Sequence, residues 1–322
     1  MINPLTQQAW IFPEVGGADV LIETQLPVTT PQAGEVLIKV LASGFNPIDT
    51  KIRAGLAPIA SDNHVPGCDV CGEVVALGDD VAEFALGDLV YGCAGGVKGS
   101  SGTLCEYMCA DVDLLALMPK AINTAQAAVL PLISITAYEA LKRLNIAAGD
   151  ELLVMGGTGG VGQMAIQLAR LKGAKVTATA GSESGLRFIE SLGTTAIFHS
   201  DATNTATAFN KVLDTHGGES FQAALLVAAP GAQVATINAR NTYDLAQAHA
   251  KALTIHAVFM LLPLLTGNGR KAHGEFLAWL ATEINQGNIQ PPTVDEKSPS
   301  EVVAVHADYE AGMINTKTAF VI

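Results

Sequence analysis

The stretch that decides the fold is residues 151–162, which read ELLVMGGTGGVG. Its first five residues have the character of a buried strand, and Gly157, Gly159 and Gly162 then follow with the spacing G-x-G-x-x-G. Such a loop turns tightly from strand to helix and lets the backbone approach a pyrophosphate at the helix N-terminus. A glycine-rich turn that serves packing alone is the competing interpretation. The strand before the loop and the helix predicted over residues 162–172 favour dinucleotide binding.

Helices and strands alternate on both sides of this loop. A helix is predicted over residues 125–144, with Pro131 as a kink or as a boundary between two helices. A second strand is predicted at residues 175–180 and a second helix at 185–192. This alternation predicts an α/β fold with a doubly wound parallel sheet covered by helices on both faces. The stretch 201–211 is too short for a full helix, so one flanking helix is expected to be trimmed or missing.

The two ends of the chain have a different texture. Short β-rich runs, separated by glycine, proline and aspartate, fill the part before about residue 120, and the last sixty or so residues predict a helix and a terminal strand. The predicted strands are residues 35–42, 72–77, 88–91 and 318–322, and the predicted helix is residues 274–285. The part before about residue 120 therefore predicts a β-rich domain beside the parallel sheet.

Composition narrows the class of protein. The chain has 322 residues, of which 49% are apolar and 15% charged, so it is globular with a large core. The net charge of −13 and the absence of a basic run argue against nucleic acid or an anionic membrane as a partner. The longest apolar run, residues 258–265, contains a proline and is too short to span a bilayer. The start of the chain lacks the pattern of a signal peptide, and the five cysteines suggest no disulfide scaffold, so a cytoplasmic protein is predicted.

The end of the second strand distinguishes between the two nicotinamide nucleotides. An NAD site needs an acid there to bind the ribose 2′-hydroxyl. This strand ends in Gly181 and Ser182, which leave room for a 2′-phosphate, and Glu183 is interpreted as a solvated acid at the start of a helix. The sequence therefore predicts NADPH as the cofactor.

Motifs along most of the chain resemble the zinc-free quinone oxidoreductase (zeta-crystallin-like) branch of the medium-chain dehydrogenase/reductase superfamily. They are GEVLIKV at 34–40, GFNPID at 44–49, Pro66-Gly67, GEVV at 72–75, GDLV at 87–90, GTLCEY at 102–107, Leu130-Pro131, TAY at 136–138 and DTHGG at 214–218. The resemblance implies a GroES-like catalytic domain of residues 1–122 and 262–322 around a Rossmann domain of residues 123–261. It also implies that the cofactor lies in the cleft between these domains.

The chain departs from the zinc-dependent members of that superfamily. Those members carry a cysteine where Asn46 stands and Gly-His-Glu where Gly67, Cys68 and Asp69 stand, and asparagine is a poor zinc ligand. The four-cysteine zinc lobe is also missing. A C-x-x-C site at Cys68 and Cys71 is disfavoured, because the two residues enter a strand whose side chains alternate between opposite faces. No metal is predicted, and this favours hydride transfer to an acceptor with its own electron sink, such as a quinone or an enone.

The resemblance also suggests the site residues. Asn46 and Asp49 match positions where the catalytic domain meets the nicotinamide, and Asn46 is expected to polarise the acceptor or hold the amide of the cofactor. An ordinary turn at Asn46-Pro47 is the alternative. The family's lysine for the 2′-phosphate is replaced by Gly185, so Arg187 is the candidate substitute. The residues predicted to bind the cofactor are Thr136, Thr158, Gly159, Gly160, Val161, Gly181, Ser182, Arg187, His199 and Phe259.

Three functions remain open from the sequence. The first is an NADPH-dependent quinone reductase, and the second is an alkenal or enone double-bond reductase on the same scaffold. The third is a non-catalytic NADPH-binding protein with a structural or sensing role. The apolar run at residues 253–260 is expected to be an edge strand, and in this family such a strand often pairs across a homodimer.

Overall fold

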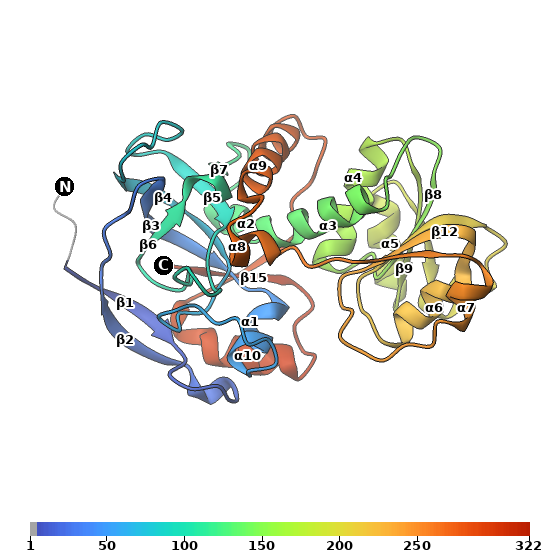
Figure 1. Ribbon diagram of the computed structural model, residues 1–322, viewed down its shortest axis with the longest axis horizontal. Helices are drawn as coiled ribbons and strands as arrows, with labels where there is room; N and C mark the ends of the chain where they lie inside the picture. The colour runs from blue at the N-terminus through green and yellow to red at the C-terminus, as the bar shows by residue number, and fades with distance from the viewer. Residues whose placement is uncertain (1–4) are drawn as a thin grey trace. The chain divides into compact units, whose positions relative to one another are not determined.

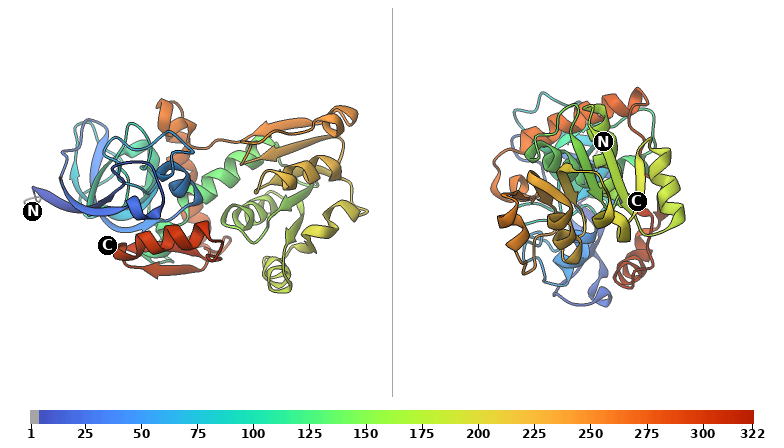
Figure 2. Two further views of the ribbon diagram at one scale, coloured as in Figure 1. Left: turned by 90° about the horizontal axis from the view of Figure 1, so that it is seen from below. Right: turned by 90° about the vertical axis from the view of Figure 1, so that its right-hand side faces the viewer.

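The computed structural model describes residues 5–322 and divides into two compact units. The parallel-sheet unit is Ile133–Met260, and the β-rich unit combines the chain up to Leu132 with Leu261–Ile322. Both ends of the chain therefore belong to one unit, as the blue and red segments of Figure 2 show. No helix among the described residues is long and apolar enough to cross a bilayer.

The parallel-sheet unit contains six strands, all parallel, in the order β10-β9-β8-β11-β12-β13 (Figure 1). The strands are β8 (Glu151–Met155), β9 (Lys175–Ala180), β10 (Thr195–Phe198), β11 (Phe209–Asp214), β12 (Ala228–Thr236) and β13 (Thr254–Ala257). The helices are α3 (Pro131–Arg143), α4 (Gly160–Leu171), α5 (Glu183–Ser191), α6 (Glu219–Val227) and α7 (Ala246–Ala250). This is the strand order of a doubly wound dinucleotide-binding sheet, and it confirms the predicted fold class.

The core of this unit explains why its strands are apolar throughout. Leu153, Val212 and Val234 come from neighbouring strands and are fully buried, and Phe221 of α6 packs against them. Parallel strands are covered on both faces, so they carry continuous apolar runs rather than an alternating pattern. Between β10 and β11 the chain forms only the 3-10 helix η3 (His199–Asn204), which confirms the expected loss of a full helix there.

The β-rich unit is built on a seven-stranded sheet in which β14-β15-β3-β4-β5-β7 are neighbours in that order and β6 pairs with β3. Its strands are β3 (Glu35–Gly44), β4 (Asp69–Leu77), β5 (Leu89–Cys93), β6 (Tyr107–Asp111), β7 (Leu115–Leu117), β14 (Val294–Lys297) and β15 (Lys317–Val321). A separate hairpin joins β1 (Thr6–Ile11) to β2 (Ile22–Pro27). The last strand, β15, pairs antiparallel with β3, so the end of the chain is fixed beside residues 42–44.

Helices and short 3-10 turns complete the β-rich unit. The helices are α1 (Pro47–Arg53), α2 (Thr124–Ala128), α8 (Leu262–Thr266), α9 (Arg270–Asn285) and α10 (Val302–Glu310). The 3-10 turns are η1 (Ala18–Val20), η2 (Val112–Leu114) and η4 (Pro299–Glu301). Pro131 begins α3, so it separates two helices rather than kinking a single one.

The two compact units divide at Leu132/Ile133, ten residues after the domain boundary predicted at 122/123. Helix α2 belongs to the β-rich unit because Ala125 and Val129 pack against Ala319 of β15 in one apolar cluster. The sequence assigned this helix to the parallel-sheet unit because it adjoins α3 in the chain. Packing, rather than sequence proximity, determines the division.

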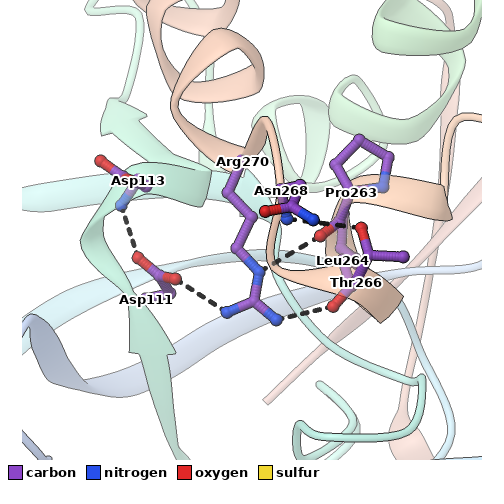
Figure 3. Close-up of polar contacts among 7 residues, drawn as sticks. All are labelled: Asp111, Asp113, Pro263, Leu264, Thr266, Asn268 and Arg270. Atoms are coloured by element: carbon purple, nitrogen blue, oxygen red, sulfur yellow. Dashed lines mark hydrogen bonds and ion pairs between the residues drawn. The ribbon is translucent and has the colours of Figure 1, made fainter.

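Arg270 holds the segment through which the chain re-enters the β-rich unit. Its guanidinium forms an ion pair with Asp111 at 2.8 Å and donates to the carbonyl oxygens of Pro263 and Leu264 at 3.4 and 2.6 Å (Figure 3). The planar guanidinium thus donates to two carbonyl oxygens of α8 and also reaches β6. One side chain therefore joins α8, α9 and β6.

Candidate active site

The glycine loop lies at the point where the strand order of the parallel sheet reverses. It follows β8, whose neighbours are β9 on one side and β11 on the other. Helix α4 begins at Gly160, with Gly159 as its N-cap and no side-chain cap, so the first N–H groups of the helix have no side-chain partner at the cap. Ligands of open α/β sheets bind at this switch point beyond the carboxyl ends of the strands.

The glycines of the loop have two different tasks. A Cβ at Gly162 would lie 2.1 Å from the carbonyl oxygen of Gly156, and a Cβ at Gly157 would lie 2.8 Å from the side chains of Ala178 and Ile189. These two glycines therefore allow the loop to pack. A Cβ at Gly159 would meet only the carbonyl oxygen of Gly156, at 3.5 Å, and Gly159 is exposed. The space above Gly159 is thus open to a ligand, which fits the close approach of a pyrophosphate.

A buried hydroxyl connects this loop to the next strands. Thr179 of β9 accepts a hydrogen bond from the backbone N–H of Gly156 at 3.0 Å, and its hydroxyl lies 2.7 Å from Nδ1 of His199. His216, in the turn after β11, forms an edge contact with His199 at 6.0 Å between ring centroids. The tertiary structure thus brings His199 to the edge of the nucleotide loop, and it adds His216, which is not among the site residues predicted from the sequence.

The end of β9 carries the residues predicted to contact the 2′-phosphate. Ser182 caps α5 by accepting from the N–H of Gly185 at 3.2 Å, and its hydroxyl also lies 3.1 Å from that of Ser184. Arg187 stands one helical turn on, with a side chain 68% exposed, and forms an i,i+4 ion pair with Glu183 at 3.6 Å. Arg187 is therefore free to exchange this exposed partner for another anion, because such pairs contribute little.

The remaining cofactor candidates lie elsewhere in the same unit. Thr158 is exposed in the loop and Val161 is half-buried in the first turn of α4. Thr136 is buried on α3, and Phe259, 45% exposed, follows β13. Their assignment to the cofactor stays a prediction.

In the β-rich unit, Asn46 and Asp49 belong to one buried polar network. Asn46 caps α1, and its backbone N–H donates to Oδ2 of Asp49 at 2.8 Å. The side-chain amide of Asn46 has other partners than Asp49. Its Nδ2 donates to Oδ2 of Asp69 at 2.9 Å, and its Oδ1 accepts from Nζ of Lys317 at 2.8 Å. The backbone N–H of Leu132 also donates to Asp69, at 3.0 and 3.2 Å. A charged group therefore faces each end of the Asn46 amide.

Burial dominates the electrostatics of this network. Burial raises the pKa of Asp69 from 3.8 to about 7 and the pKa of Asp49 from 3.8 to about 6. The Lys317 ammonium and the Asn46 amide act against this rise at Asp69, while the nearby Asp49 adds to it. Burial also lowers the pKa of Lys317, and the two carboxylates oppose that shift. The thiol of Cys93 faces Asp69 as well, and its pKa is raised by burial and by both carboxylates.

The unfolding free energy should therefore fall as the pH rises from about 4 to about 7, and Asp69→Asn should reduce this fall. The folded protein holds a proton on Asp69 at pH values where the unfolded chain has released it, so raising the pH favours the unfolded chain. An amide at position 69 does not titrate. Urea unfolding across this pH range would compare the wild type, Asp69→Asn and, as a control, Asp62→Asn at an exposed position. Equal pH dependence in all three proteins would contradict the prediction.

The cysteines do not gather into a site. All five are free, and Cys68 and Cys71 contact different partners: the thiol of Cys68 lies 3.5 Å from Asp49, and the sulfur of Cys71 lies 3.3 Å from that of Met118. The C-x-x-C spacing thus serves two faces of a strand. Among residues 5–322, no group of three or more His, Cys, Asp or Glu side chains is placed to hold a metal ion.

Two members of the network escaped prediction from the sequence. The sequence presents Asp69 only as the counterpart of a zinc-site residue, and its place after Gly67 at the start of a buried strand is the one further signal. Lys317 was not selected at all. Its only local signal is a single cation directly before a buried terminal strand.

The two units have the fold of nucleotide-dependent dehydrogenases and reductases. Residues 32–120 match the alcohol dehydrogenase GroES-like domain, and residues 160–272 match the zinc-binding dehydrogenase domain. An alcohol dehydrogenase superfamily protein from Novosphingobium aromaticivorans superposes with a TM-score of 0.91 at 34% identity, covering 98% of this chain and 99% of that one. The chain belongs to the medium-chain dehydrogenase/reductase superfamily, in its quinone oxidoreductase branch.

Two oxidoreductases of known name are similar to this chain in sequence. The NADPH-dependent alkenal/one oxidoreductase of Arabidopsis thaliana chloroplasts is 44% identical over 200 residues, which are 59% of this chain and 51% of that protein. This chain thus spans about half the length of that relative. The quinone oxidoreductase of Mus musculus is 29% identical over 311 residues, which are 92% of this chain and 91% of that protein.

Proposed function

We propose that the protein is an NADPH-dependent oxidoreductase that transfers hydride to a quinone or a similar electrophilic acceptor without zinc. The observation that carries the proposal is the open space above Gly159 at the switch point of the parallel sheet. Membership of the quinone oxidoreductase branch agrees with it, as do the names of the mouse and Arabidopsis relatives.

The parallel-sheet unit would hold the cofactor, which supplies the hydride when it is bound. Gly159, Gly160 and Val161 present the backbone N–H groups at the start of α4 to a pyrophosphate, and Thr158 stands exposed beside them. Gly181, Ser182, Arg187 and His199 are assigned to the recognition of a 2′-phosphate near the end of β9. Thr136 and Phe259 are assigned to the nicotinamide side of the site.

The β-rich unit would act on the acceptor through Asn46. One Nδ2 hydrogen goes to Asp69, and the second is available to an acceptor oxygen on which negative charge develops. Asn46 is fully buried, whereas Pro47 next to it is exposed, so an acceptor reaches the amide only when neighbouring side chains move aside. Asp49 fixes the backbone of this turn, and the proton that completes the reduction comes from solvent.

The test is NADPH oxidation followed at its nicotinamide absorbance against a panel of quinones and enones. Turnover of quinones supports the proposal. Turnover of alkenals and enones alone would assign the protein to double-bond reduction, which the 44% identity to the Arabidopsis relative specifically favours. Tight NADPH binding without turnover on any acceptor would indicate the non-catalytic, structural or sensing role instead.

The purified protein is expected to hold no stoichiometric zinc and to keep its activity with chelators. The reason is the donor set: Asn46 replaces a thiolate, and the Lys317 cation lies 2.8 Å from its oxygen, where a second cation would be repelled. Elemental analysis of protein grown without added metal checks this. About one zinc per chain, or loss of activity on chelation, would refute it.

The exposed strand β13 would make the protein a homodimer. This strand is the last of the sheet order and its residues Thr254, Ile255 and Ala257 are exposed, so its free edge can pair with a second copy. Sedimentation equilibrium should show twice the chain mass, and Ile255→Lys should shift it to the monomer. A monomer in the wild type would exclude the pairing.

The five free cysteines support a location in a reducing compartment, the cytoplasm.

A further inference from the structure

Lys317 occupies an unusual place for a lysine. It opens β15 and is partly buried, and this burial lowers the pKa of its ammonium. Two of its hydrogen bonds go to the turn that precedes α1: to the carbonyl oxygen of Phe45 at 2.7 Å and to Oδ1 of Asn46 at 2.8 Å. The cation therefore reaches the side chain assigned to the acceptor from a point 271 residues further along the chain.

The chemistry of the two neighbours allows one orientation of the Asn46 amide. An ammonium has donors only, and the Asp69 carboxylate has acceptors only once it is ionised, which holds above a pH of about 7. With Oδ1 toward Lys317 and Nδ2 toward Asp69, both hydrogen bonds form and both are assisted by charge. The flipped amide would place N–H groups against the ammonium and an oxygen against the carboxylate. Lys317 donates to Asn46, and Asn46 in turn donates to Asp69. These two consecutive hydrogen bonds polarise the amide and strengthen its N–H donors.

The stability of the fold does not by itself explain why a lysine lies beside the Asn46 amide. Buried charges lose solvation, and a well-packed apolar side chain in their place is often neutral or stabilising. A partly buried lysine beside the Asn46 amide has a functional account instead, because it fixes which atom of the amide remains available to the acceptor.

We propose that Lys317 is a positioning residue: it holds the Asn46 amide with its nitrogen as the available donor for the acceptor. This role rests on the proposed function of Asn46 but not on which acceptor is reduced. Lys317 itself touches no reacting atom in the proposal. Its contribution passes through the orientation and polarity of Asn46.

The experiment compares Lys317→Met, Lys317→Gln and Lys317→Arg in the full chain, with Lys297→Met on the adjacent strand β14 as the matched control. For Lys317→Met we expect kcat with a quinone to fall roughly tenfold to a hundredfold, with the Kd for NADPH unchanged. Lys317→Arg keeps the charge and the donors and should restore a substantial part of kcat. Lys297→Met should behave as the wild type. Equal losses in the Arg and Met variants, or wild-type kcat in folded Lys317→Met, would overturn the proposal.

A second readout does not need turnover. In protein labelled with ¹⁵N-asparagine, the side-chain resonance of Asn46 is identified by its loss in Asn46→Ala. Its hydrogens should exchange slowly in the wild type and in Lys317→Arg, and faster in folded Lys317→Met, or in Lys317→Gln if the methionine variant fails to fold. Slow exchange that depends on Lys317, without turnover on any acceptor, would refute the proposed function and leave the positioning role intact. Turnover with unchanged exchange in these variants would refute the positioning role alone.

Discussion

Gly159→Val should weaken NADPH binding by roughly a hundredfold or more while the protein keeps its fold. The valine side chain enters the space in which a pyrophosphate would approach the start of α4, so several hydrogen bonds to the phosphates are lost together. The fold tolerates it because a Cβ at Gly159 meets nothing closer than 3.5 Å and the residue has extended backbone angles, φ −71° and ψ 162°. Isothermal titration with NADPH measures the loss, and circular dichroism with urea unfolding checks the fold.

Gly162→Val is the matched control for this loop. Its Cβ would lie 2.1 Å from the carbonyl oxygen of Gly156, so the turn itself must shift and stability should drop. The two variants are thus expected to separate binding from folding. If Gly159→Val bound NADPH as tightly as the wild type, the loop would be a packing turn and the proposed function would lose its main support.

Arg187→Ala should weaken NADPH binding roughly tenfold to a hundredfold and leave NADH binding almost unchanged. A charge-assisted contact with a 2′-phosphate contributes roughly 1.5–3 kcal/mol. The present partner of Arg187 is an exposed i,i+4 ion pair with Glu183, worth only about 0.3–0.5 kcal/mol, so exchanging it for a phosphate costs little. Titration of both nucleotides into wild type and variant measures the preference.

Glu183→Gln is the control for this side chain. It releases Arg187 and removes a negative charge near the end of β9, so NADPH affinity should rise a few-fold, by about 0.5–1 kcal/mol. Equal losses for NADPH and NADH in Arg187→Ala would mean that Arg187 is structural. A wild-type preference for NADH would overturn the interpretation of the strand end.

Several features of this protein could be predicted because their signals are local. The strand, the three spaced glycines and the helix after them lie within residues 151–172, and each part is encoded by the backbone freedom or apolarity of its own residues. Pro131 gave the boundary between α2 and α3 in the same way, and the short stretch after β10 gave the missing helix. The unit to which α2 belongs could not be predicted in this way, because it depends on contacts with β15 near the end of the chain.

The sequence by itself determined the parallel sheet, the glycine loop and the absence of an acid at the end of β9. Only the tertiary structure separated the open Gly159 from the packed Gly162, and only it placed His216 against His199. It alone also joined Lys317, Asn46 and Asp69 into one network. The physical reason is distance along the chain. Antiparallel pairing of β15 with β3 brings a cation to a carboxylate and an amide hundreds of residues earlier, and the burial that shifts their pKa values exists only once both ends of the chain have packed together.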